Sequence, residues 1–155
     1  MPSTLEPVGL ERTDGKRPDG LTSFPWKYGK HMAWDVTCVD TLAQTYLPRT
    51  TVEAGSAASE AERKKTEKYR FLEPNTLFSP AAFETFGPWG PGAKDLINEI
   101  GRRAFLRSGE PRTMNFLRQR ISIEIQRGNA ASVLGTFEYS RGLEEVFYIL
   151  SFKQR

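Results

Sequence analysis

The segment KRPDGLTSFPWKYGKHMAWDVTCV, residues 16–39, decides the fold because it predicts a β-hairpin. Residues 21–26 and 31–39 are short segments rich in aromatic and β-branched residues, which favour strands. Gly29 lies in the KYGK segment between them and is typical of a turn. Pro25 removes an N–H group from the first strand, so we expect this strand to be bent or to lie at a sheet edge.

Two aspartates, Asp19 and Asp35, stand in this segment beside strand-like sequence. With a turn centred on residues 27–29, Asp35 lies across from about residue 21, and Asp19 lies two residues further on. Because side chains alternate along a strand with a period of two, this register puts both carboxylates on one face. A register that differs by one residue puts them on opposite faces, and Gly20 can also supply a bulge that turns Asp19 inward.

Two carboxylates on one face repel each other unless a cation lies between them. Mg²⁺ prefers such oxygen ligands, keeps several waters, and can activate a water for attack on a phosphate. A neighbouring lysine would hold that water or a phosphate oxygen, and Lys65 and Lys68 are the candidates. The alternative is ordinary turn chemistry for Asp19, a solvent-facing Asp35, and lysines that only solvate a helix. Spacing alone favours this alternative.

The rest of the chain predicts helices and one further strand, and therefore an α/β or α+β domain with a small sheet. Ala54, Ala58 and Ala61 form a small-residue face that continues into Lys65 and Lys68. The predicted order is an extended lead-in (residues 1–15), the hairpin, a helix (57–72), a strand (75–86), a break at GPWGPG (87–92), two amphipathic helices (93–109 and 113–135) and a divergent tail (136–155).

Composition limits the classes of function. Cys38 is the single cysteine, which excludes an internal disulfide framework and favours a reducing, intracellular compartment. No apolar run is long enough to span a membrane. The net charge of +3 is mild. Basic residues nevertheless outnumber acidic ones by eight to four in residues 94–135, which suits a solvated surface and a polyanion-facing one equally well. The eight are Lys94, Arg102, Arg103, Arg107, Arg112, Arg118, Arg120 and Arg127.

Five motifs resemble a family of metazoan retroelement-derived proteins. They are DGKRPDGLT (14–22), WDVTCVDTLA (34–43), AERKKTEKY (61–69), ETFGPWGPGA (84–93) and LRQRISIEIQRGNAASVLGT (117–136). In that family the module lies downstream of a reverse transcriptase domain. It is similar to the restriction-like endonuclease of site-specific non-LTR retrotransposons, a PD-(D/E)xK nuclease. The resemblance covers most of the chain, from about residue 5 to residue 137.

The resemblance implies a restriction-endonuclease-like domain over residues 16–135. Its fold would be a small mixed sheet of β-hairpin, helix and strand, flanked by two C-terminal helices, with the first helix of that fold missing. By position, Asp19 corresponds to the PD aspartate and Asp35 to the (D/E) residue, and both would be metal ligands. Thr37 stands where the usual lysine would be, so the lysine is expected from the following helix, Lys65 before Lys68.

The resemblance also implies a cofactor and partners. Mg²⁺, or Mn²⁺ in its place, would support nicking of DNA so that a 3′ end can prime reverse transcription. A reverse transcriptase domain or retroelement RNA would be a further partner of a nuclear or cytoplasmic protein. Glu84 would either face the sheet that carries the aspartates or lie in solvent at a strand end. The alternative is a catalytically inactive nucleic-acid-binding remnant, or a truncated reading frame without activity. The arginines expected to neutralise DNA phosphates are Arg102, Arg103, Arg120 and Arg127.

Overall fold

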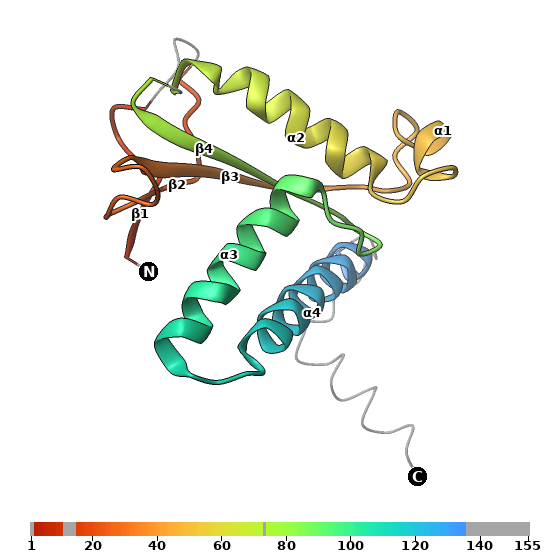
Figure 1. The fold of residues 1–155 in the computed structure, drawn as a ribbon. Helices are drawn as coiled ribbons and strands as arrows, with labels where there is room; N and C mark the ends of the chain where they lie inside the picture. The colour runs from red at the N-terminus through yellow and green to blue at the C-terminus, as the bar shows by residue number, and fades with distance from the viewer. Residues whose placement is uncertain (1, 11–14, 73, 136–155) are drawn as a thin grey trace. The chain divides into compact units, whose positions relative to one another are not determined.

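The computed structural model describes residues 2–10, 15–72 and 74–135. The chain divides into two compact units, residues 1–117 and 118–155. The first unit contains the sheet and is mixed α/β, as predicted (Figure 1). None of the described helices is both long and apolar enough to cross a membrane. The tail predicted at residues 136–155 lies outside the described residues.

A four-stranded sheet in the order β1-β2-β3-β4 organises the first unit. The pairs β1–β2 and β2–β3 are antiparallel, whereas β3 and β4 are parallel. β1 lies within the predicted lead-in, so part of that segment extends the sheet. Pro80 lies inside β4, which is an edge strand, where the absence of its N–H group is tolerated. The strands are β1 (Ser3–Leu5), β2 (Gly20–Thr22), β3 (His31–Val39) and β4 (Thr76–Glu84).

The predicted hairpin between β2 and β3 is confirmed. Tyr28 and Gly29 both have positive φ angles, 54° and 69°, and Lys30 N donates a 3.0 Å hydrogen bond to Lys27 O. A two-residue turn with two positive φ angles has the twist that a hairpin needs. β2 lies between β1 and β3, so the expected edge position of this strand was wrong. The strand ends before Pro25, and the proline therefore stands outside the ladder of hydrogen bonds.

The described helices follow the predicted order. α3 begins inside the predicted break, directly after Gly90, and ends at Ser108, with Gly109 (φ 69°) as its left-handed C-cap. α1 lies between the predicted hairpin and the predicted helix at residues 57–72, where no element was expected. α4 crosses the boundary between the two units, and none of its residues is buried. The helices are α1 (Leu47–Thr50), α2 (Ser56–Lys68), α3 (Pro91–Ser108) and α4 (Thr113–Leu134), and a short 3-10 helix (Arg70–Leu72) follows α2.

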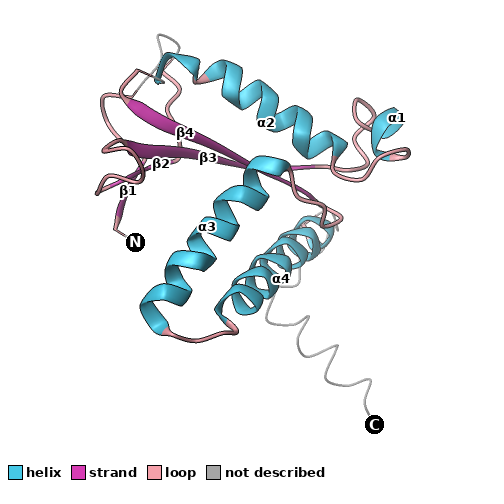
Figure 2. Ribbon diagram, viewed as in Figure 1, coloured by secondary structure: helices cyan, strands magenta, loops and turns pink. Residues whose placement is uncertain are grey.

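α2 and α3 cover opposite faces of the sheet (Figure 2). Successive side chains of β3 point to opposite faces. Ala33 packs against Tyr69 and Leu72, which follow α2 directly, whereas Trp34 lines a cavity together with Ile97 of α3. The odd-numbered residues of β3 therefore face α2, and the even-numbered residues face α3.

The contact between α2 and the sheet consists largely of alanines. Ala58 and Ala61 of α2 and Ala82 of β4 form one buried cluster. Such small side chains let the helix lie close to the sheet, and the predicted small-residue face of α2 is thereby confirmed at these two positions. The close approach also brings the longer side chain of Lys65, further along the same stripe, within reach of β3.

Candidate functional site

Asp35 lies on the α2 face of β3 and forms an ion pair with Lys65. Asp35 is 3 % exposed, and Lys65 Nζ donates a hydrogen bond to its Oδ1. A buried carboxylate is stable only when a positive charge or hydrogen-bond donors compensate it. The pair therefore joins α2 to β3 at the position where the resemblance places a metal ligand and a lysine.

Asp19 immediately precedes β2, and its side chain reaches the backbone of β3 next to Asp35. Its Oδ2 accepts a 2.7 Å hydrogen bond from Val36 N, the amide that directly follows Asp35. Gly20 pairs with Trp34 and Leu21 with Ala33, so the next position along the ladder sets Asp19 opposite Asp35. Both aspartates therefore belong to the α2 face of the sheet. Of the predicted site residues, the structure brings Asp19, Asp35 and Lys65 together.

The predicted register between the aspartates was wrong by two residues. Asp35 was expected across from about residue 21, but Ala33 takes that place. A register shift of two residues leaves every side chain on the same face of the sheet. The prediction that the two aspartates share a face therefore still holds. Gly20 forms no bulge: it pairs with Trp34, and a Cβ atom at this glycine would lie only 2.1 Å from Trp34 Cζ2. The glycine makes room for the indole ring.

The donor set at this place fits a hard divalent cation. Hydrogen bonds occupy Oδ2 of Asp19 and Oδ1 of Asp35, and within the described chain the second oxygen of each carboxylate accepts none. Two carboxylates with waters completing the shell are a common way to bind Mg²⁺. Among the described residues no three His, Cys, Asp or Glu side chains converge, so a cation here would rely on these two carboxylates.

Lys68 and Tyr69 support the segment that carries Asp19. Tyr69 is fully buried, and its hydroxyl donates a 2.7 Å hydrogen bond to Arg17 O. Lys68 Nζ donates to the same hydroxyl at 2.8 Å and lies 4.4 Å from the centre of the Tyr69 ring. Between the two predicted lysines, Lys65 contacts an aspartate directly, and Lys68 contacts the residue that holds the backbone before Pro18 and Asp19.

A buried glutamate of α2, Glu62, binds three backbone amides. Its Oε1 accepts hydrogen bonds from Ala82 N at 3.0 Å and Ala93 N at 2.8 Å, and its Oε2 accepts one from Gly92 N at 2.8 Å. The carboxylate thus caps the N-terminus of α3 and ties α2 to β4, three residues before Lys65. A charged residue in a polar helix sequence predicts solvent exposure, so the sequence did not reveal this role.

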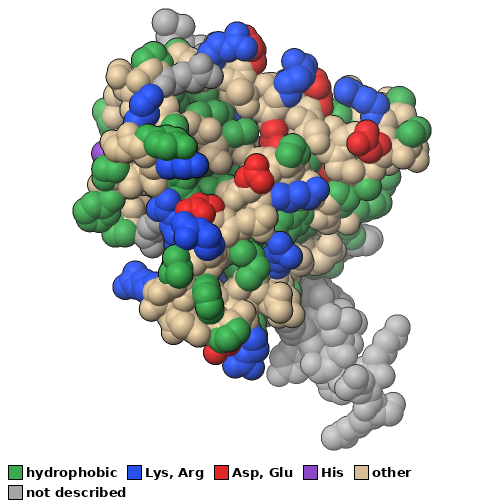
Figure 3. All heavy atoms as spheres, viewed as in Figure 1, with side chains coloured by type: hydrophobic (Ala, Val, Ile, Leu, Met, Phe, Trp, Pro, Cys, Tyr) green, Lys and Arg blue, Asp and Glu red, His purple; other side chains and the backbone are tan. Residues whose placement is uncertain are grey.

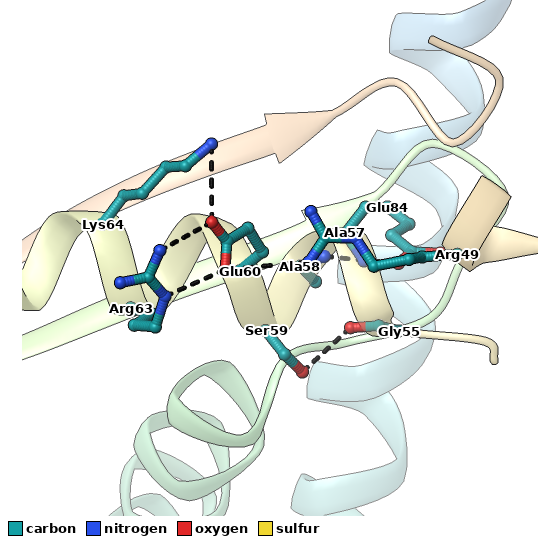
Figure 4. Close-up of polar contacts among 9 residues, drawn as sticks. All are labelled: Arg49, Gly55, Ala57, Ala58, Ser59, Glu60, Arg63, Lys64 and Glu84. Atoms are coloured by element: carbon teal, nitrogen blue, oxygen red, sulfur yellow. Dashed lines mark hydrogen bonds and ion pairs between the residues drawn. The ribbon is translucent and has the colours of Figure 1, made fainter. Parts of the chain in front are cut away.

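Glu84 caps the N-terminus of α2 in a similar way. Its Oε1 accepts hydrogen bonds from Ala57 N at 2.9 Å and Ala58 N at 3.2 Å, and Figure 4 shows its side chain directed at this first turn. Glu84 is fully buried and faces α2 from the sheet that carries the aspartates, so the first of its two expected positions is confirmed and the alternative in solvent at a strand end is wrong. A carboxylate at a helix N-terminus compensates the unpaired N–H groups and the helix dipole. Glu62 and Glu84 therefore fix the helix that carries Lys65.

The predicted DNA-binding arginines of α3 lie away from the aspartates. Arg102 and Arg103 belong to the helix on the opposite face of the sheet, and both donate to Glu99. The hydrogen bond from Arg102, followed by that from Arg103, lowers the pKa of Glu99 to about 2. Arg103 also stacks 3.7 Å from the centre of the Trp26 ring and donates to Trp26 O. These contacts give Arg103 a structural role on that face.

The other two predicted arginines, Arg120 and Arg127, belong to the second unit and share Glu124 as a partner. Their charge is partly offset there. On the face shown in Figure 3, Lys and Arg side chains are interspersed with Asp and Glu rather than gathered into one basic patch. The distribution of charge on this face therefore gives little support to a large polyanion-binding surface.

Two cavities of about 540 and 550 Å³ are lined by Met32, Leu96 and Arg103, on the α3 side of the sheet. Neither is lined by Asp19, Asp35 or Lys65, so these cavities do not belong to the carboxylate site.

Comparisons with protein-family models, with curated proteins and with solved structures found no match. A proposal about function therefore rests on the geometry of the described residues and on the resemblance of the sequence motifs.

Proposed function

We propose that this protein is a metal-dependent DNA endonuclease with a restriction-endonuclease-like domain of retroelement origin. The observation that supports the proposal most is the convergence of Asp19 (just before β2), Asp35 of β3 and Lys65 of α2. The sequence separates these residues widely, and they come together only because β2 pairs with β3 and α2 packs on the same face. Two carboxylates can hold a hard cation that activates water, and a lysine can stabilise charge that develops on a phosphate oxygen, so this set suits phosphodiester hydrolysis.

Each residue has a distinct role in the proposed reaction. Asp19 and Asp35 would hold Mg²⁺ or Mn²⁺, which supplies Lewis acidity and a bound water of lowered pKa. The Lys65 ammonium would hold the attacking water or stabilise the charge on a phosphate oxygen. The water oxygen would add to phosphorus and lose a proton to solvent, the P–O3′ bond would break, and the departing O3′ would take up a proton from solvent. The products are a 5′ phosphate and a 3′ hydroxyl, and the latter can prime a reverse transcriptase partner acting on retroelement RNA.

Supercoiled plasmid DNA with Mg²⁺ tests this proposal. Purified full-length protein is expected to convert the plasmid to the nicked circle, and D19N and D35N are expected to abolish the conversion because a neutral amide binds the cation poorly. D40N is the matched control: Asp40 is exposed at the end of the same strand and caps a local turn through Leu42 N. Nicking at equal rates by wild type and D35N would refute the metal site.

The competing function is a nucleic-acid-binding module without catalysis. It predicts DNA binding that weakens steeply as salt increases, together with no nicking at any concentration of Mg²⁺ or Mn²⁺. That combination of results would overturn the endonuclease proposal. The same plasmid and protein preparations serve for both measurements, so a loss of folding in a variant is recognised by its loss of DNA binding and of its circular dichroism spectrum.

A further inference from the structure

The ion pair between Lys65 and Asp35 uses a carboxylate that the proposed cation also needs. The side chain of Asp35 is 4 % exposed, whereas that of Lys65 is 26 % exposed. The carboxylate is therefore fixed within the fold, and the ammonium ends a long side chain that is partly in solvent. Lys65 also stands in the last turn of α2 and is not part of the alanine cluster, so a turn of its side chain toward solvent leaves that contact in place.

Asp19, unlike Asp35, is held by a neutral group. Its Oδ2 is held by the backbone N–H of Val36, which is uncharged and places no positive charge beside a bound cation. The two carboxylates therefore differ: the amide of Val36 orients Asp19, and an ammonium group neutralises Asp35. A divalent cation that binds both would meet the like charge of Lys65 at Asp35.

We propose that Lys65 and a divalent cation are alternative partners of Asp35. Lys65 keeps the buried carboxylate neutralised until a cation arrives, and binding of the cation displaces the ammonium and releases it toward the phosphate. Linkage makes this competition reciprocal: whatever strengthens the ion pair weakens cation binding, by at most the same factor. The inference rests on the proposed metal site and adds that Lys65 becomes available to the substrate only when the site is loaded.

Titration with Mn²⁺ alone, followed by the electron paramagnetic resonance signal of the free ion, measures the competition without any activity assay. K65M keeps the length of the side chain and removes its charge, so it is expected to bind Mn²⁺ about tenfold more tightly or better, as one like charge at this range implies. K65R keeps the charge and is expected to bind close to wild type. K64M is the matched control, because Lys64 is the neighbour on α2 and pairs with Glu60 instead.

Thermal unfolding supplies a second readout. Without metal, K65M is expected to melt below wild type because Asp35 loses its counter-charge, and Mn²⁺ is expected to raise its melting temperature more than that of wild type. If K65M does not fold without metal, Mn²⁺-dependent recovery of its circular dichroism spectrum supports the proposal equally.

The outcomes separate this inference from the proposed function. Unchanged or weaker Mn²⁺ binding by K65M, with binding abolished in D35N, would overturn the competition and leave the metal site standing. Absence of Mn²⁺ binding in both wild type and K65M would overturn the competition and the metal site together. Tighter binding by K64M to the same extent as K65M would assign the effect to general surface charge and refute a specific role of Lys65.

Discussion

Glu62 of α2 and Ala93 of α3 are joined by a 2.8 Å hydrogen bond from a backbone N–H to a buried carboxylate. The same carboxylate accepts from Ala82 and Gly92, so one side chain connects two helices and the edge strand. The apolar contact of α2 with the sheet is made by small alanines. The hydrogen bonds of Glu62 therefore do much to fix the position of α2 and of Lys65 on it.

Glu62→Ala is therefore expected to destabilise the fold strongly. It leaves three amide donors without their acceptor, and the expected loss is about 3 kcal/mol or more. Glu62→Gln keeps one acceptor oxygen and is expected to cost less. Glu67→Gln is the matched control on the same helix, since Glu67 is exposed and pairs only locally with Arg70; its effect should stay within about 0.5 kcal/mol. Urea unfolding measures all three, and equal losses for the Glu62→Ala and Glu67→Gln variants would contradict a clamping role.

Local pattern was sufficient to predict the hairpin and the lysine-bearing helix. Gly29 marks the turn because its positive φ is inexpensive only for glycine, and the spacing of Ala58, Ala61 and Lys65 places them along one stripe whatever the rest of the chain does. Tertiary packing then preserves the turn and the helix that the local sequence already favours. For this reason the strand that carries Asp35 and the helix that carries Lys65 could both be predicted from the sequence, and so could the packing of that helix on the sheet.

Contacts between distant segments could not be predicted in this way. The parallel pairing of β3 with β4 depends on the crossover through α2, and no local signal sets its register. Glu62 stands beside Arg63 and Lys64, so it resembles any solvated helix residue until α3 supplies amide donors. The GPWGPG segment predicted only a break. A Cβ atom at Gly90 would lie 2.3 Å from Glu62 Oε1, so this glycine also makes room for the carboxylate.

The glycine of the PDG motif is expected to be intolerant of alanine. A methyl group at Gly20 would overlap the Trp34 ring, and relief requires movement of the indole or of β2 beside Asp19. Gly20→Ala should destabilise by about 1–3 kcal/mol, the usual range for overpacking. A double-mutant cycle with Trp34→Ala isolates the cause: once the ring is removed, the added methyl should cost much less. If the cost is the same in both backgrounds, contact with the indole is not its origin.

The hydroxyl of Tyr69 is expected to hold the segment before Asp19. Tyr69→Phe removes the hydrogen bond to Arg17 O and should cost about 1 kcal/mol. Hydrogen exchange at the Val36 amide, which donates to Asp19, should become faster in this variant because the aspartate is held less firmly. Tyr46→Phe is the control, since the Tyr46 ring lies near Lys64 and away from this segment. Unchanged exchange at Val36 in Tyr69→Phe would show that the hydroxyl does not position Asp19.

The ion pairs of Glu99 predict a specific dependence of stability on pH. The arginines of α3 lower the pKa of this carboxyl from 4.5 to about 2 in the folded protein. A lowered pKa means that the folded state favours the ionised form, so the contribution is complete above pH 4.5 and is lost as pH falls toward 2. The difference in stability between wild type and Glu99→Gln should therefore be constant above that range and vanish toward its lower end.

Urea unfolding at a series of pH values, each at low and at high salt, measures this difference. The side chain of Glu99 is 30 % exposed, so the effect should be small and high salt should reduce it. Added salt distinguishes an electrostatic origin of the stability difference between wild type and Glu99→Gln from a packing origin. An electrostatic contribution declines with added salt and disappears at low pH, whereas a contribution from packing around Trp26 and Arg103 persists under both conditions. A difference between wild type and Glu99→Gln that survives both treatments would therefore show that Glu99 acts by arranging the stack of Arg103 on Trp26 and not through its charge.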